Sequence, residues 1–169
     1  EVLFLDDDNV PLRDPTFLFH PAAYREHGSL FWPDRERHGP DSALWQIYSV
    51  PYRDEPMHET GQMVIDKQRC WRALQLTMHA NEFSGFFYRH SFGDTALLRF
   101  ALHALGQPFG MIPHRLLELP VAREVEDLAA LASTPYLRQP GDIQAAFVQR
   151  GPEGDPLFLH RCAAKLRLG

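Results

Sequence analysis

A short apolar run that leads directly into three aspartates is the feature of this sequence that most constrains its fold. Residues Val2 to Leu5 are continuously apolar, which is typical of a β-strand buried on both faces. Asn9 and Pro11 follow the aspartates and are expected to stop strand pairing. A core strand at the very start of a chain needs neighbours on both sides. We therefore expect this chain to be a fragment of something larger, with further residues upstream of Glu1.

Strands and helices are predicted to alternate along the rest of the chain. Apolar runs predict strands at residues 63–65, 108–112, 145–148 and 157–160, the last two forming a hairpin around the turn at 151–154. Apolar residues at helical spacing predict helices at 67–79, 94–105 and 123–132, the second ended by Gly106. On the first of these helices Cys70, Trp71, Leu74 and Met78 share one face. Residues 13–58 show no regular pattern. This alternation predicts an α/β fold with residues 1–169 as part of a single domain.

Composition excludes several classes of protein. The chain is 44% hydrophobic and 23% charged, as in an ordinary folded domain, so disorder is not expected. A net charge of -5 with no concentrated basic face argues against nucleic acid as a partner. No apolar run approaches the roughly 18–20 residues that span a membrane. The two cysteines, Cys70 and Cys162, are too few for a disulfide scaffold and favour buried thiols, although one disulfide remains open.

The aspartates predict a metal site. Side chains alternate along a strand, so Asp6 and Asp8 are expected to leave its end in one direction and Asp7 in the other. Carboxylates this close repel one another, and a cation offsets that repulsion. Their oxygen ligands suit Mn²⁺ or Mg²⁺, which leave positions open for substrate phosphates. An acidic turn that only caps a strand is the structural alternative.

A second candidate motif lies near the end of the chain. The apolar run Leu157 to Leu159 is followed by His160, and Lys165 comes five residues later. A histidine nitrogen can complete a carboxylate metal site, and a lysine can neutralise a diphosphate as a point charge. Taken alone, a histidine after a strand is more often structural. The hypothesis therefore depends on its pairing with the aspartates.

Other polar residues are candidates for contacts with a sugar. Gly61 would let a ligand approach the backbone closely, and Glu59 and Gln62 offer hydrogen bonds to hydroxyl groups, unless this segment is only a turn before a strand. Asp94 is a further candidate for contacts with the reacting sugar, and its spacing also fits a helix N-cap. The aromatic pair at residues 31–32 is expected either to stack on acceptor sugar rings or to pack in the core.

Together these motifs resemble one enzyme family. Four segments are similar, in the same order and spacing, to the fungal-type Golgi α-mannosyltransferases, glycosyltransferase family 71: residues 3–15 (LFLDDDNVPLRDP), 28–34 (GSLFWPD), 59–67 (ETGQMVIDK) and 93–101 (GDTALLRFA). In the last segment Thr95 stands where the family has lysine, which leaves the identity of donor and acceptor open.

The resemblance implies a fold and a reaction. It implies a GT-A-type mixed sheet flanked by helices, with the nucleotide-binding strands upstream of Glu1 missing from this chain. It also implies Mn²⁺, a nucleotide-sugar donor such as GDP-mannose, a glycan acceptor, transfer with retention of configuration, and location in the Golgi lumen. By this resemblance Asp6, Asp8 and His160 would bind the metal, and Lys165 the diphosphate. Asp6, Asp7 and Gly61 are further candidates for contacts with the nucleotide-sugar cofactor.

Other readings of the same residues lead to different functions. An apolar strand followed by Asp6 and Asp8 also fits a haloacid-dehalogenase-like phosphatase, with Asp6 as nucleophile and Asp8 as acid. The second acidic motif of such an enzyme would begin at Asp94, but residues 97–99 are Leu, Leu and Arg, so its second carboxylate is missing. A glycoside hydrolase with two carboxylates and a noncatalytic carbohydrate-binding module are further alternatives.

Overall fold

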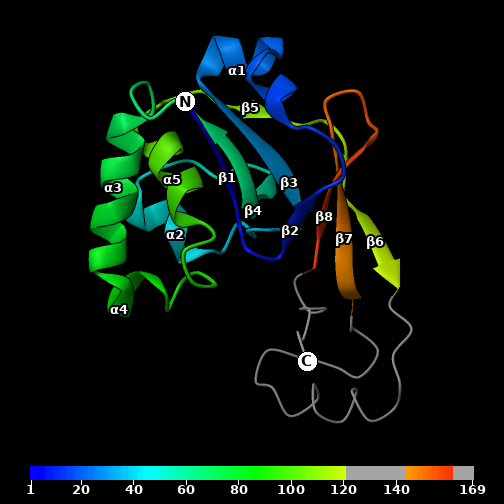
Figure 1. Ribbon diagram of the computed structural model, residues 1–169. Helices are drawn as coiled ribbons and strands as arrows, with labels where there is room; N and C mark the ends of the chain where they lie inside the picture. The colour runs from blue at the N-terminus through cyan, green and yellow to red at the C-terminus, as the bar shows by residue number, and fades with distance from the viewer. Residues whose placement is uncertain (121–143, 162–169) are drawn as a thin grey trace.

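The computed structural model describes residues 1–120 and 144–161, which form two sheets and a set of helices (Figure 1). The first sheet has the strand order β1-β4-β3-β5 and is mixed, because β3 and β5 are parallel whereas the other pairs are antiparallel. The second sheet has the order β2-β8-β7-β6 and is antiparallel. The strands are β1 (Val2–Leu5), β2 (Asn9–Pro11), β3 (Ser29–Arg37), β4 (Pro56–Ile65), β5 (Gly110–Met111), β6 (Leu117–Pro120), β7 (Gln144–Arg150) and β8 (Pro156–His160).

The helices cover the two faces of the first sheet. They are η1 (Thr16–Phe19), α1 (Ala22–His27), α2 (Ala43–Ile47), α3 (Trp71–Glu82), α4 (Ser84–Phe87) and α5 (Leu97–Ala104). Side chains that alternate along β3 separate the two cores. Phe31 packs with α3 and α5 on one face, whereas Leu30 and Trp32 pack with η1, α1 and β8 on the other. The predicted α/β class, a mixed sheet flanked by helices, is therefore confirmed, and the arrangement is compatible with part of a GT-A fold.

Several predicted elements are confirmed and others are wrong. The hairpin of β7 and β8, the strand at β5 and the end of α5 before Gly106, whose φ is 60°, agree with the sequence pattern. β1 is a strand, but it lies at the edge of the first sheet and Phe4 is 45% exposed, so it is not buried on both faces. Asn9 and Pro11 do not stop pairing, because they form β2 and pair with β8. The helix predicted at 123–132 lies outside the described residues.

Residues 13–58 are more regular than predicted. They contain η1, α1, α2 and the nine-residue strand β3, which lies between β4 and β5 in the first sheet. Trp32 is fully buried, and its indole Nε1 donates to the backbone oxygen of Arg150 at 2.7 Å, which joins the two sheets. Phe31 is also buried. Of the two roles that the sequence allows for this pair, core packing is therefore the one observed.

Two helix predictions also need correction. α5 begins at Leu97 rather than at Asp94; its N-cap is Ala96, and Asp94 makes no side-chain capping bond. On α3, Trp71 and Met78 are 58% and 57% exposed, so they do not share a buried face with the core residue Cys70.

Cys70 is a buried free thiol, and burial is the main reason why its pKa is raised. Cys162 lies outside the described residues. Within the described part of the chain, no helix combines the length and apolar character that a membrane crossing requires.

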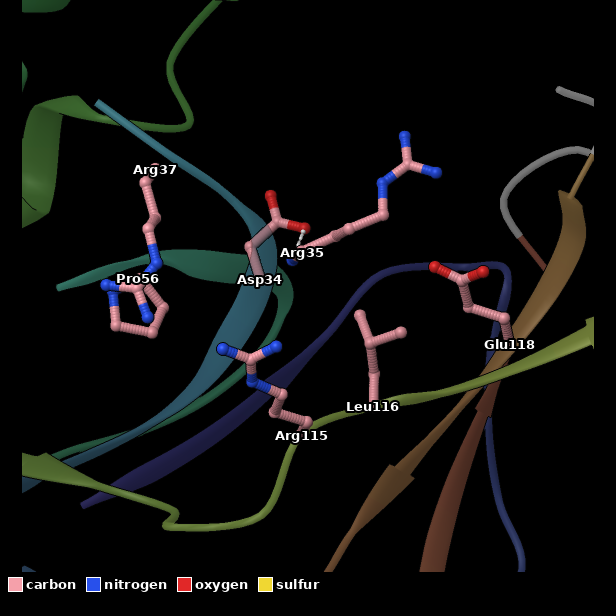
Figure 2. Close-up of a pocket in the computed structure, with 7 residues that line it drawn as sticks. All are labelled: Asp34, Arg35, Arg37, Pro56, Arg115, Leu116 and Glu118. Carbon is pink, nitrogen blue, oxygen red and sulfur yellow. Dashed lines mark hydrogen bonds between the residues drawn. The ribbon is translucent and has the colours of Figure 1, made fainter. Parts of the chain in front are cut away.

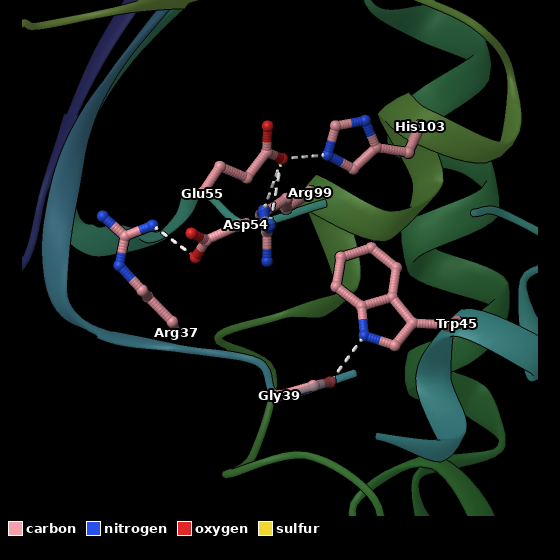
Figure 3. Close-up of polar contacts among 7 residues, drawn as sticks. All are labelled: Arg37, Gly39, Trp45, Asp54, Glu55, Arg99 and His103. Carbon is pink, nitrogen blue, oxygen red and sulfur yellow. Dashed lines mark hydrogen bonds and ion pairs between the residues drawn. The ribbon is translucent and has the colours of Figure 1, made fainter. Parts of the chain in front are cut away.

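A charged cluster lies where α5 meets the residues that precede β4 (Figure 3). The carboxylate of Glu55 accepts hydrogen bonds from Arg99 Nε at 3.2 Å and Nη2 at 2.9 Å, and it lies 2.5 Å from His103 Nε2. The Arg99 side chain is fully buried, and its guanidinium lies 5.5 Å from the Trp45 ring. Because an unpaired buried guanidinium is costly, Glu55 is expected to stabilise the packing of α5 on this side of the sheet.

Candidate functional site

The aspartates form a turn between the two sheets. β1 ends at Leu5, and the backbone N–H of Asn9 donates to the oxygen of Asp6 at 3.0 Å, which closes the turn. The strand-like alternation predicted for Asp6 to Asp8 is therefore wrong. Asp6 and Asp7 are exposed, whereas the side chain of Asp8 is only 13% exposed and turns toward the second sheet.

The register of β2 and β8 brings the aspartate turn next to the end of β8. Asn9 pairs with His160, and the backbone N–H of Arg161 donates to the oxygen of Asp8 at 2.9 Å. His160 Nε2 consequently lies 3.3 Å from Asp8 Oδ1, and its Nδ1 lies 3.6 Å from Glu59 Oε1. The structure thus brings together two of the predicted metal ligands, Asp8 and His160, with Glu59 on the other side of the imidazole ring.

Glu59 borders a bulge in β4, and the segment is therefore not the turn before a strand that the sequence left as an alternative. β4 pairs Met63 with Phe31 and then Glu59 with Trp32, so residues 60–62 are extra on β4 relative to β3. Glu59 Oε1 accepts from the backbone N–H of Gly61 at 2.9 Å, which holds the bulge closed. The bulge therefore aims the Glu59 carboxylate at His160.

Gly61 leaves space for two side chains of the site. A Cβ atom at this position would lie 2.8 Å from both Asn9 Nδ2 and His160 Cε1. Asn9 Nδ2 donates to the Gly61 oxygen at 2.9 Å and to Gln62 Oε1 at 2.7 Å. In this structure the side chains of Asn9 and His160, rather than a ligand, thus lie close to the Gly61 backbone. Gln62 is fully buried, and its Oε1 positions Asn9 by accepting this second hydrogen bond.

Replacing Gly61 with alanine is expected to disturb this site. The added methyl group must displace Asn9 or His160, and overpacking of this kind costs about 1–3 kcal/mol. We expect a lower free energy of unfolding in urea denaturation and weaker metal-dependent ligand binding. Gly85→Ala is a matched control, since nothing lies within 4 Å of a Cβ there. Equal stability and ligand binding of Gly61→Ala and the unsubstituted protein would contradict the packing argument.

The carboxylates and the histidine shift each other's ionisation. Burial lowers the pKa of His160, but the charges of Glu59, Asp8 and Asp6 outweigh it and the pKa is raised above its ordinary value. Burial alone would raise the pKa of Glu59, yet His160 and nearby backbone N–H groups lower it. Burial, followed by the charge of Asp8, raises the pKa of Asp6. The local charge is therefore negative, and it favours a cation.

The donor set fits a divalent metal that takes few ligands from the protein. Among residues 1–120 and 144–161, no three His, Cys, Asp or Glu side chains are grouped closely enough to hold a metal by themselves. Mg²⁺ commonly uses one or two carboxylates and completes its shell with water and substrate phosphates. Adjacent ligands of an octahedral metal lie about 3 Å apart. The 3.3 Å between Asp8 Oδ1 and His160 Nε2 is compatible with that spacing.

Asp6 and Asp94 line one groove beside the turn. The groove has a volume of about 400 Å³, and its walls include Phe4, Met63 and Lys67. Asp6 and Asp94 are 88 positions apart in the sequence, so their spacing alone could not predict that they line the same groove. Asp8 and His160 do not line this groove but lie where the two sheets meet, which we call the sheet junction. The predicted residues therefore divide between the groove and the sheet junction. Lys165 lies outside the described residues.

Comparisons with known proteins support the resemblance. A sequence profile of the family described as "Mannosyltransferase putative" matches residues 1–49. The chain is 34% identical over 127 residues to alpha-1,2-mannosyltransferase MNN2 of Candida albicans, which covers 52% of this chain and 21% of that protein. It is 25% identical over 148 residues to alpha-1,2-mannosyltransferase MNN24 of the same organism, with 64% and 21% covered.

The chain spans about a fifth of the length of these curated relatives. The profile match contains the Asp6–Asn9 turn and all of β3. The profile match therefore includes Asp8, whereas Glu59 and His160 lie outside it. The resemblance of this chain to the fungal-type α-mannosyltransferase family, predicted from its sequence motifs, is confirmed.

Proposed function

We propose that this chain carries the metal- and acceptor-binding part of a glycosyltransferase that transfers mannose from GDP-mannose to a glycan acceptor, with Mn²⁺ and with retention of configuration. The observation that carries the proposal is the convergence of Asp8, Glu59 and His160 from three distant parts of the chain. The similarity to two mannosyltransferases favours this activity over a haloacid-dehalogenase-like phosphatase, a glycoside hydrolase or a carbohydrate-binding module. The Golgi lumen is the compartment proposed with it.

The chain's own residues divide the work of such a reaction. Asp8 and His160 would hold the metal, and Asp6 adds negative charge beside them. A bound Mn²⁺ would supply charge stabilisation for the leaving diphosphate. Glu59 orients the imidazole of His160 from its far side, as carboxylates do for many metal-binding histidines. Asp94, across the groove from Asp6, is the proposed contact for the reacting sugar.

Calorimetry with nucleotides tests the proposal directly. We expect the full-length protein to bind GDP only when Mn²⁺ is present, and to bind GDP more tightly than UDP. Asp8→Ala is expected to remove the metal-dependent part of the binding, whereas Asp41→Asn, at an exposed position, is expected to retain it. Absence of metal-dependent binding of either nucleotide would contradict the proposed function. Preference for UDP would leave the metal site standing and exclude GDP-mannose as donor.

A further inference from the structure

A separate cavity lies beyond the sheet junction, between the end of β3 and the segment that leads into β6. Its volume is about 190 Å³, and Figure 2 shows charged side chains from both segments around it. β3 contributes Asp34, Arg35 and Arg37, and the opposite wall includes Arg115 and Leu116. None of these residues has a role in the site described above.

The cavity adjoins the candidate metal site. Trp32 pairs with Glu59 across the first sheet, and Asp34 follows two residues later on β3. Burial, followed by the charge of Glu59, raises the pKa of Asp34 to about 6, so the two carboxylates are close enough to interact. The Asp34 side of the cavity is therefore near Glu59, whose Oε1 lies 3.6 Å from His160 Nδ1.

Two polar groups that line the cavity have partners within the protein. Asp34 Oδ1 accepts from the backbone N–H of Arg35 at 2.5 Å. Arg37 Nη1 lies 3.0 Å from Asp54 Oδ1, an ion pair visible in Figure 3. A carboxylate accepts hydrogen bonds and a guanidinium donates several in a rigid fork. Groups of both kinds around one cavity suit a ligand that both donates and accepts, as neighbouring hydroxyl groups do.

The rest of the lining favours a small neutral ring. Pro56 and Leu116 provide apolar surface for C–H groups. An anion would meet the carboxylates of Asp34 and Glu118 as well as the guanidinium groups. The volume is below the roughly 300–1,000 Å³ typical of pockets for drug-sized ligands, so it suits one ring rather than an extended oligosaccharide.

We propose that this cavity is a subsite for one hexose unit of the acceptor glycan, with Asp34 accepting hydrogen bonds from its hydroxyl groups and Arg115 donating to them. That the bound sugar belongs to the acceptor rests on the proposed function. The binding of a sugar in this cavity can nevertheless be measured without turnover. It assigns substrate recognition to β3 and to the segment before β6, separately from the metal ligands.

Binding of methyl α-D-mannopyranoside to the full-length protein, followed by protein-observed NMR, tests the subsite. We expect saturable shifts of Asp34, Arg115 and Leu116 signals. Loss of a hydrogen bond to a charged group weakens binding by about tenfold or more, so Arg115→Ala and Asp34→Asn should each raise the Kd by at least about that factor. Arg89→Ala, at an exposed position on another surface, is the matched control.

Kinetics with the same sugar as acceptor provides a second readout. Both variants are expected to raise KM for the sugar about tenfold and to leave GDP binding unchanged. An unchanged Kd in Arg115→Ala would overturn the inference, as would inorganic phosphate displacing the sugar at lower concentration than free mannose does. Metal-dependent GDP binding without sugar binding would also overturn it while the proposed function stands. Sugar binding that depends on Arg115, without any metal-dependent nucleotide binding, would support the subsite and contradict the proposed function.

Discussion

Asp8→Ala is expected to lower kcat for mannosyl transfer by about 10²–10³-fold, the range seen when one preorganised electrostatic contact to a developing charge is lost. Asp8 is the aspartate that the structure places beside His160, at 3.3 Å, with its side chain only 13% exposed. Without the Asp8 carboxylate, His160 would be the only metal ligand left of the Asp8–His160 pair. Activity is measured with the full-length protein, GDP-mannose and a mannoside acceptor across a range of Mn²⁺ concentrations.

Two further variants show whether this loss is specific. Asp7→Ala changes an exposed neighbour in the same turn and is expected to have a smaller effect. Glu59→Gln removes the charge behind His160, and loss of such a supporting group typically costs about 10–100-fold in metal affinity or activity. Excess Mn²⁺ should restore part of the activity of Glu59→Gln. Normal turnover by Asp8→Ala, with folding confirmed by circular dichroism, would exclude Asp8 as a metal ligand.

Part of this site follows from sequence patterns alone. The apolar runs before Asp6 and His160 predict two strands, and both exist, although in different sheets. The pairing of Asp8 with His160 could be proposed because each follows a strand and their residue types suit one metal. The contribution of Asn9 could not be seen, because a turn that places it opposite His160 depends on β2 pairing with β8, across most of the chain length.

The larger errors have a physical cause in tertiary pairing. The sequence pattern does not predict β3, because Pro33 lacks a backbone donor and argues against a central strand. The structure tolerates Pro33 at a point where the register of β3 and β4 shifts, so the hydrogen-bonded ladder is interrupted nearby. Glu59 to Gln62 has the composition of a turn, but the same segment is a bulge because β1 and β3 pair on its two sides. Local composition does not distinguish a turn from a bulge when both neighbours come from elsewhere.

Glu55→Gln is expected to lower the free energy of unfolding at pH 7 by about 2–3 kcal/mol, because it leaves the guanidinium of Arg99 buried without a charged partner. Burial alone would raise the pKa of Glu55, but hydrogen bonds from His103 and Arg99 and their charges lower it to about 2. Urea denaturation measures the loss. Glu82→Gln, whose side chain is 72% exposed, is the control and should change stability by no more than about 0.5 kcal/mol.

The difference in stability between Glu55→Gln and the unsubstituted protein is also expected to depend on pH. The sign of this dependence follows from the pKa of Glu55. The folded-state pKa of Glu55, about 2, lies below its ordinary value of 4.5, so the folded state favours the ionised carboxylate. Its contribution is therefore present in full above pH of about 4.5 and is lost as the pH falls toward 2. The stability difference between Glu55→Gln and the unsubstituted protein should shrink over that interval, while other titrating carboxylates cancel in the comparison. A difference that stays constant from pH 7 to pH 2.5 would mean that packing, and not the charge of Glu55, stabilises α5 against β4.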